Sequence, residues 1–213
     1  GAGAAAMACA KLFRSTGIPK NNIKMLDTKG VINKKRKDIN TWKKEFAVDT
    51  KDKSLDDAMK NADVFLGLSA AGVVKKSMVR KMAKNPIIFA CANPDPEIKP
   101  EDIEEVRDDA IIATGRSDYP NQVNNSLAYP GFFRGLIDSR AKKITVEMEI
   151  AASKALASVI ENENLSEDFI MPSMFDGNVV KKISDSITSI VSEQSISRKK
   201  ISNSGYNSFK RFH

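Results

Sequence analysis

The first residues of the chain have types and spacing suited to binding a phosphate group. They match the pattern G-x-G-x-x-A, in which the first glycine makes a tight turn and the second lets a pyrophosphate approach the backbone. The N–H groups at the start of the helix that follows bind phosphate oxygens. The pattern alone is a weak signal, because helices often begin in glycine and alanine. The candidate cofactor-binding residues are Gly1, Ala2, Gly3, Ala4 and Ala5.

An acid follows at about the expected spacing of 20-odd residues. Asp27 ends the apolar run at residues 23–27, and a carboxylate there accepts hydrogen bonds from a ribose 2′-hydroxyl and repels a 2′-phosphate. An acid at a strand end is otherwise a common turn residue. The basic run at residues 34–37 points the other way, because Lys34, Lys35 or Arg36 can pair with a 2′-phosphate. These residues leave the choice between NAD and NADP open.

Amide side chains follow two further apolar runs. Asn93 comes directly after residues 87–91 and before a proline, at the carboxyl end of a strand, where open α/β sheets bind ligands. The alternative is a plain Asn-Pro turn. The block at residues 114–125 also follows an apolar run and combines amides, a hydroxyl, a cation and an aromatic ring. This set of groups suits a small carboxylate ligand.

The elements that must position these residues alternate between strand and helix. Apolar strands are expected at residues 23–27, 63–69, 87–91 and 110–114, with helices at 2–13, 55–61 and 75–83 and another that opens at Pro100. This alternation predicts the α/β class, a Rossmann-like doubly wound parallel sheet. The strand that normally precedes such a glycine turn is missing in front of Gly1, so we expect the sheet to lack its first strand.

After the amide-rich block, the sequence predicts helices and no further strands. Helices are expected at residues 126–140, 145–160 and 178–193, the last two with apolar residues at three- and four-residue spacing. We therefore expect a dinucleotide-binding domain over residues 1–125, helices packing on it over 126–200, and a frayed tail over 201–213.

Composition narrows the class of protein. The chain has 213 residues, of which 41% are hydrophobic, and lacks both an apolar run of about 18 residues and a leader peptide, which predicts a cytoplasmic protein with no membrane partner. The net charge is +7, but the lysines are spread along the chain, so we expect a solvated loop at residues 34–37 and no nucleic-acid partner. Cys9 and Cys91 form no C-x-x-C pair and are expected to be buried and reduced.

Several stretches resemble successive blocks of the NAD(P)-binding domain of bacterial malic enzymes, and the block at residues 114–125 is highly specific to that family. The resemblance covers about residues 1–200 and rests on residues 1–10, 25–30, 62–69, 90–100, 113–125 and 130–135. It implies oxidative decarboxylation of malate to pyruvate and carbon dioxide, with hydride passing to NAD or NADP and a Mg²⁺ or Mn²⁺ ion polarising the substrate. It also implies a homo-oligomer at full length.

The resemblance further implies roles for individual residues. The glycine turn binds the pyrophosphate, Asp27 lies by the adenosine ribose, Asn93 contacts the nicotinamide half of the cofactor, and Asn124 and Asn125 lie at the substrate carboxylate. The sequence of residues 67–72 most resembles the NADP-linked bacterial branch of the family, which favours NADP slightly as the cofactor.

The sequence also departs from the family. The tyrosine, the lysine and the carboxylate metal ligands of malic enzymes lie upstream of the glycine turn, so this chain should hold no catalytic or metal-binding residue. We interpret Asp95, Glu97 and Asp118 as loop acids. We therefore expect a fragment that is inactive by itself. The alternatives are a stand-alone dinucleotide-binding module and another Rossmann hydroxy-acid dehydrogenase.

Overall fold

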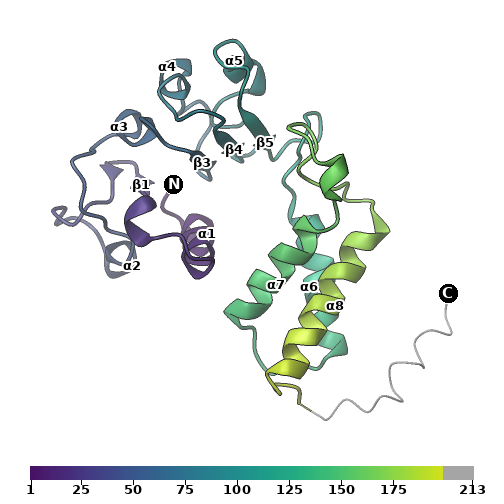
Figure 1. The fold of residues 1–213 in the computed structure, drawn as a ribbon. Coiled ribbons are helices and arrows are strands. Elements are labelled where there is room, and N and C mark those ends of the chain that lie inside the picture. The colour runs from purple at the N-terminus through teal and green to yellow at the C-terminus, as the bar shows by residue number, and fades with distance from the viewer. Residues whose placement is uncertain (199–213) are drawn as a thin grey trace. The chain divides into compact units, whose positions relative to one another are not determined.

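The computed structural model describes residues 1–198, which divide into two units (Figure 1). The first unit comprises Gly1–Val123 together with Asn162–Met171. The second comprises Asn124–Glu161 and the chain from Pro172 onward. The frayed tail predicted for residues 201–213 lies outside the described residues.

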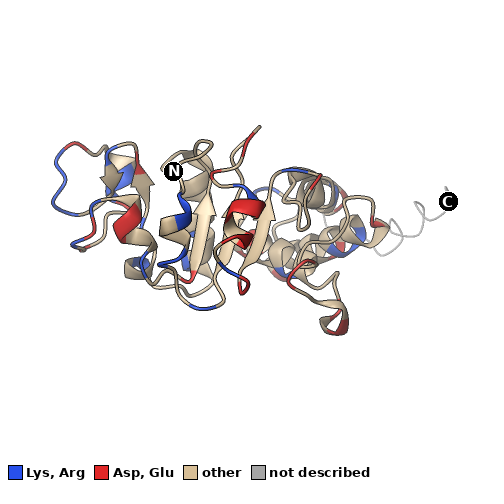
Figure 2. Cartoon of the chain, turned by 90° about the horizontal axis from the view of Figure 1, so that it is seen from above, with Lys and Arg blue, Asp and Glu red and all other residues tan. Residues whose placement is uncertain are grey.

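Basic and acidic residues occur on elements throughout the described chain (Figure 2). No helix among residues 1–198 is long and apolar enough to cross a membrane. Cys9 and Cys91 are both free thiols, and both are half-buried. The expectation of burial was therefore wrong for both, since each thiol keeps part of its surface exposed.

A parallel sheet of three strands forms the centre of the first unit. The strands are β3 (Val64–Gly67), β4 (Ile87–Ala90) and β5 (Ile111–Thr114), in the order β3-β4-β5. In register, Val64 lies opposite Ile87, which lies opposite Ile111. The predicted α/β class with a parallel, Rossmann-like sheet is confirmed, and all three strands coincide with predicted apolar runs. Because the strands are parallel and start together, their carboxyl ends lie at one edge of the sheet.

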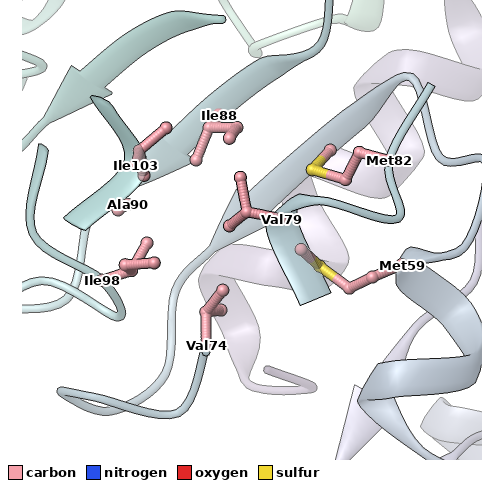
Figure 3. Close-up of a cluster of buried hydrophobic side chains, with 8 residues drawn as sticks. All are labelled: Met59, Val74, Val79, Met82, Ile88, Ala90, Ile98 and Ile103. Carbon is pink, nitrogen blue, oxygen red and sulfur yellow. The ribbon is translucent and has the colours of Figure 1, made fainter. Parts of the chain in front are cut away.

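A short helix precedes each strand in the chain, and these helices contribute side chains to the core of the sheet. They are α3 (Leu55–Met59), α4 (Lys76–Val79) and α5 (Pro100–Glu104). At the start of α3, the side chains of Ser54 and Asp57 form a reciprocal capping box with the backbone. Figure 3 shows the buried side chains of this core, which come from the three helices, from β4 and from the loops between them, namely Met59, Val74, Val79, Met82, Ile88, Ala90, Ile98 and Ile103.

A second core lies under α1 (Ala4–Ser15) and a two-stranded antiparallel sheet. The strands are β1 (Leu26–Asp27) and β2 (Gly30–Val31), and two short helices accompany them, η1 (Lys20–Asn22) and α2 (Thr41–Lys44). The prediction of a strand over residues 23–27 in the parallel sheet was wrong. The chain turns back at Gly30, whose φ is +105° and whose hydrogen faces the Lys53 carbonyl too closely for any side chain. As a result of this turn, β1 pairs with β2, the strand that directly follows it in the chain.

The second unit is helical, as predicted. It contains α6 (Asn125–Asp138), α7 (Val146–Ala157) and α8 (Gly177–Glu193), while the 3₁₀ helix η2 (Asn162–Asn164) belongs to the first unit. Gly131 and Gly135 of α6 face Ile183 and Ile187 of α8. The opposite face of α6 exposes large apolar side chains, namely Tyr129, Phe133 and Ile137.

Candidate functional site

The glycine turn at the start of α1 is open on one side and closely packed on the other. A side chain at Gly3 would meet no atom within 4 Å, whereas a Cβ at Gly1 would lie 2.6 Å from the Leu68 carbonyl oxygen. Gly3 is the N-cap of α1, and no side chain caps the helix. The first N–H groups of α1 have no intrahelical acceptors, so they are available to an anion above Gly3. The exposed residues Ala4 and Ala5 leave this end accessible.

Asp27 lies at the end of β1 and is held by two cations. Its Oδ1 accepts from Arg36 Nη1 at 2.8 Å, and its Oδ2 accepts from Arg36 Nη2 at 3.1 Å and from Lys43 Nζ at 2.7 Å. The hydrogen bonds from Arg36, followed by that from Lys43, hold the pKa of Asp27 well below its usual range. Asp27 is therefore an ionised acceptor whose two oxygens are already engaged.

The basic run beside Asp27 is only partly solvated. Lys34 and Lys35 are exposed, but the Arg36 side chain is 13% exposed and also donates to Asp38 at 3.0 Å. The expectation of a solvated loop at residues 34–37 was wrong for Arg36, because the guanidinium binds two carboxylates at once. The sequence allowed Lys34, Lys35 or Arg36 as the contact to a 2′-phosphate. Of these three, Arg36 is the residue that binds Asp27.

The loops after β3 and β4 come together at the carboxyl edge of the sheet. Asn93 is exposed in the loop after β4, and Ser69 is exposed in the loop after β3. Both loops are joined to Glu97, which lies in the loop after β4, as predicted, but is completely buried, which the sequence did not indicate. Asp95 and Asp118 are exposed loop acids, as predicted. The sequence carried one signal for this buried carboxylate. Gly67 ends β3 at a position where an apolar residue would be expected, and its missing side chain leaves room for Glu97.

The amide-rich block after β5 uses most of its polar groups internally. Arg116 pairs with Asp118 at 2.7 Å and lies over the Tyr119 ring, at 5.7 Å from its centroid. The Tyr119 hydroxyl donates to Glu101 at 2.7 Å. Asn121 is buried, with its Nδ2 donating to the carbonyls of Ile112 and Glu167 at 2.9 and 2.7 Å. In this block, Asn121 holds the excursion at residues 162–171 to the first unit.

The two asparagines predicted at the substrate belong to the start of α6 in the second unit. Asn124 is the N-cap, and its side chain accepts from the Ser126 N–H at 3.0 Å. Asn125 is the first residue of the helix and is exposed. The position of Asn125 at an exposed helix start leaves its amide accessible, whereas Asn124 already serves as a cap.

The hollow beside α5 does not suit a carboxylate ligand. It has a volume of about 330 Å³ and is lined by acids from α5 and neighbouring loops, namely Glu101, Glu104, Asp108, Glu167 and Asp168. Nor do the side chains of residues 1–198 include a group of three or more His, Cys, Asp or Glu residues that could hold a metal ion. The described residues therefore do not fit a divalent cation, and no step through a metal is assigned to them.

The parallel sheet, the open glycine turn and the acid at the end of β1 define an α/β domain of the dinucleotide-binding class. The family described as "malic enzyme, NAD binding domain" matches residues 1–196. The probable NADP-dependent malic enzyme of Rickettsia prowazekii is 47% identical over 94% of this chain and 28% of its own length. The NAD-dependent malic enzyme of Geobacillus stearothermophilus is 44% identical over 93% of this chain and 42% of its own.

A solved structure agrees with these relatives. The crystal structure of the Entamoeba histolytica malic enzyme matches with a TM-score of 0.85 and 36% identity, over 92% of this chain and 42% of that one. The chain therefore belongs to the malic enzyme family and corresponds to its NAD-binding domain. It spans from 28% to 50% of the length of such curated relatives.

Proposed function

We propose that this chain is the NAD(P)-binding part of a longer malic enzyme, which converts malate to pyruvate and carbon dioxide while reducing NAD(P). The observation that carries the proposal is the start of α1, where an uncapped helix N-terminus lies beneath the open space at Gly3. A dinucleotide pyrophosphate needs backbone N–H donors and room for close approach, and this turn supplies both.

The other predicted ligand contacts are proposed from the resemblance to malic enzymes. Asp27 is proposed to accept from the adenosine ribose, and Asn93 to contact the nicotinamide half. The accessible amide of Asn125, with Asn124 beside it, is proposed for the substrate carboxylate. From the resemblance, the groups that transfer protons and bind the Mg²⁺ or Mn²⁺ ion are proposed to lie elsewhere in the longer enzyme. Residues 1–198 contain no group of three or more His, Cys, Asp or Glu residues that could hold a metal ion.

NADP is the cofactor that we propose, on the charges around Asp27. Its carboxylate is paired with Arg36 and Lys43, and the neighbouring Asp38 is paired with Arg36 and Lys29, so two negative charges face three positive ones. A 2′-phosphate entering here would be attracted by the cations and could take over donors that now bind Asp27. With an unpaired Asp27, the same phosphate would be repelled.

The cofactor proposal is tested by Arg36→Gln. We expect the affinity for NADPH to fall about tenfold, as one lost charge-assisted contact implies, while the affinity for NADH changes less than twofold. Lys37→Gln is the matched control, because Lys37 is an exposed cation of the same run that was not predicted to contact the phosphate. An equal loss for both cofactors, or none for NADPH, would favour NAD.

Trp42, the only tryptophan in the sequence, gives the binding assay for the proposed function. It is 70% exposed on α2 and directly precedes Lys43, one of the partners of Asp27. Titration with NADPH or NADH should quench Trp42 emission through energy transfer to the reduced nicotinamide. Gly3→Val, which fills the open space above the turn, should abolish the effect. Absence of binding at millimolar cofactor by wild-type protein would refute the proposal.

The remaining sequence-based expectations stay proposals about the longer enzyme. They are a homo-oligomeric assembly, no nucleic-acid or membrane partner, and a cytoplasmic location.

A further inference from the structure

Glu97 is a buried acid that the predicted cofactor contacts do not include. Four polar or charged residues are buried among the described residues, and Glu97, with no exposed surface, is the acid among them. Burial of a carboxylate is costly unless hydrogen bonds satisfy it. The partners of Glu97 therefore indicate why the fold keeps it there.

The Glu97 carboxylate bridges the loops that follow β3 and β4. Its Oε1 accepts from the Ser69 N–H at 2.8 Å and from the Ser69 hydroxyl at 3.3 Å. Its Oε2 accepts from the Ala92 N–H at 2.9 Å. An ionised carboxylate accepts at both oxygens, which a carboxamide cannot do. The three donors thus specify glutamate rather than glutamine.

The end of β3 is shaped to admit this carboxylate. A Cβ at Gly67 would collide with Glu97 Cδ and would lie 2.5 and 2.7 Å from its two oxygens. The backbone strengthens the same junction, because the Val74 N–H donates to the Glu97 carbonyl at 3.0 Å. The Glu97 carboxylate is thus held by hydrogen bonds from both loops. Gly67 leaves the space that the carboxylate occupies.

Both bridged loops adjoin predicted cofactor contacts. A Cβ at Gly1 would lie 2.6 Å from the Leu68 carbonyl oxygen and 3.3 Å from Ser69 Cβ, so the segment held by Glu97 forms the floor of the glycine turn. On the other side, Ala92 directly precedes Asn93. One buried group thus connects the floor of the pyrophosphate turn to the residue assigned to the nicotinamide half.

We propose that Glu97 is a positioning residue, which sets the glycine turn and Asn93 at the spacing that one dinucleotide requires. The proposal rests on the proposed function, because it concerns how the same site is held. Glu97 itself lies beneath the surface and contacts no ligand. Its effect passes through Ser69 and Ala92.

The test compares Glu97→Gln with wild type for two classes of ligand. In the variant, one amide N–H faces the side-chain NH₂ instead of an acceptor, so the two loops separate. We expect the affinities for NADPH and NADH to fall about tenfold or more. Adenosine and 2′-AMP, which carry no pyrophosphate, should bind within twofold of wild type. Glu104→Gln makes the same chemical change at an exposed position and should alter neither.

Glu97→Asp separates the bridge from the charge. Aspartate keeps the charge and both acceptors but is one methylene shorter, so it reaches one loop and not both. We expect the same selective loss of dinucleotide affinity, measurable even if Glu97→Gln does not fold. Affinities within twofold of wild type, or an equal loss for adenosine, would overturn the positioning role. Failure of wild-type protein to bind any dinucleotide would instead refute the proposed function.

Discussion

Gly135→Ala sets two opposing effects against each other at the contact between α6 and α8. Alanine favours the helix by about 1 kcal/mol over glycine in an exposed interior position. In this position, however, a Cβ would lie 2.6 Å from Ile187 Cβ and 2.8 Å from the Ser184 carbonyl oxygen. A backbone oxygen and a branched side chain on a facing helix cannot both move away without shifting α8.

The contact should outweigh the gain in helix propensity. Overpacking of a close contact costs about 1–3 kcal/mol, so after the propensity gain of about 1 kcal/mol we expect a net loss of up to about 2 kcal/mol in the free energy of unfolding. With a urea m-value of about 2 kcal/mol/M, the midpoint should fall by up to about 1 M. Circular dichroism at 222 nm during urea titration measures it.

Gly177→Ala is the matched control. Gly177 is the first residue of α8, is exposed, and has no atom within 4 Å of its would-be Cβ. We expect its midpoint to stay equal or to rise slightly. A rise in the midpoint of Gly135→Ala equal to that of the control would refute the reasoning, because propensity would then decide the outcome and the close approach of α6 to α8 would carry no energy.

The remaining predictions concern the first unit. Hydrogen bonds from the backbone and hydroxyl of Ser54 and from the Lys53 N–H lower the pKa of Asp57 from 3.8 to about 2, so its contribution to stability is complete above pH 3.8 and is lost as the pH falls toward 2. Asp57→Asn should therefore be less stable than wild type at pH 7, and the difference should shrink below pH 3.8. Equal pH profiles of the melting temperature would contradict this. Asn121→Ala leaves the Ile170 N–H and two carbonyls without their partner, which should cost about 2–3 kcal/mol and speed protease cleavage within residues 162–171. Unchanged cleavage would show that other contacts hold this excursion.

The parallel sheet was predictable because its signals are local. Strands of a parallel sheet covered by helices are short apolar runs, and residues 63–69, 87–91 and 110–114 have this composition. The pairing of β1 was not predictable in the same way. An apolar run predicts a strand but not its partner, and the turn at Gly30 directs this one to β2.

Candidate site residues can be proposed from the sequence where a contact depends on the type of one residue at one turn. Glycines at the start of a helix and an acid at the end of a strand can be recognised from the sequence alone. Glu97 was missed because its role depends on Ser69, 28 residues away, and on burial that no local pattern reveals. Arg36 was seen as a cation, but its commitment to Asp27 depends on how the loop folds.

The most direct test of the central claim is an amide NMR titration of the chain with NADPH. If the start of α1 binds the pyrophosphate, the largest shifts should fall on the N–H groups of Gly3, Ala4 and Ala5, with a second set around Asp27, and inorganic pyrophosphate should reproduce only the first set. Saturation by NADPH without shifts at Gly3 to Ala5 would contradict the account.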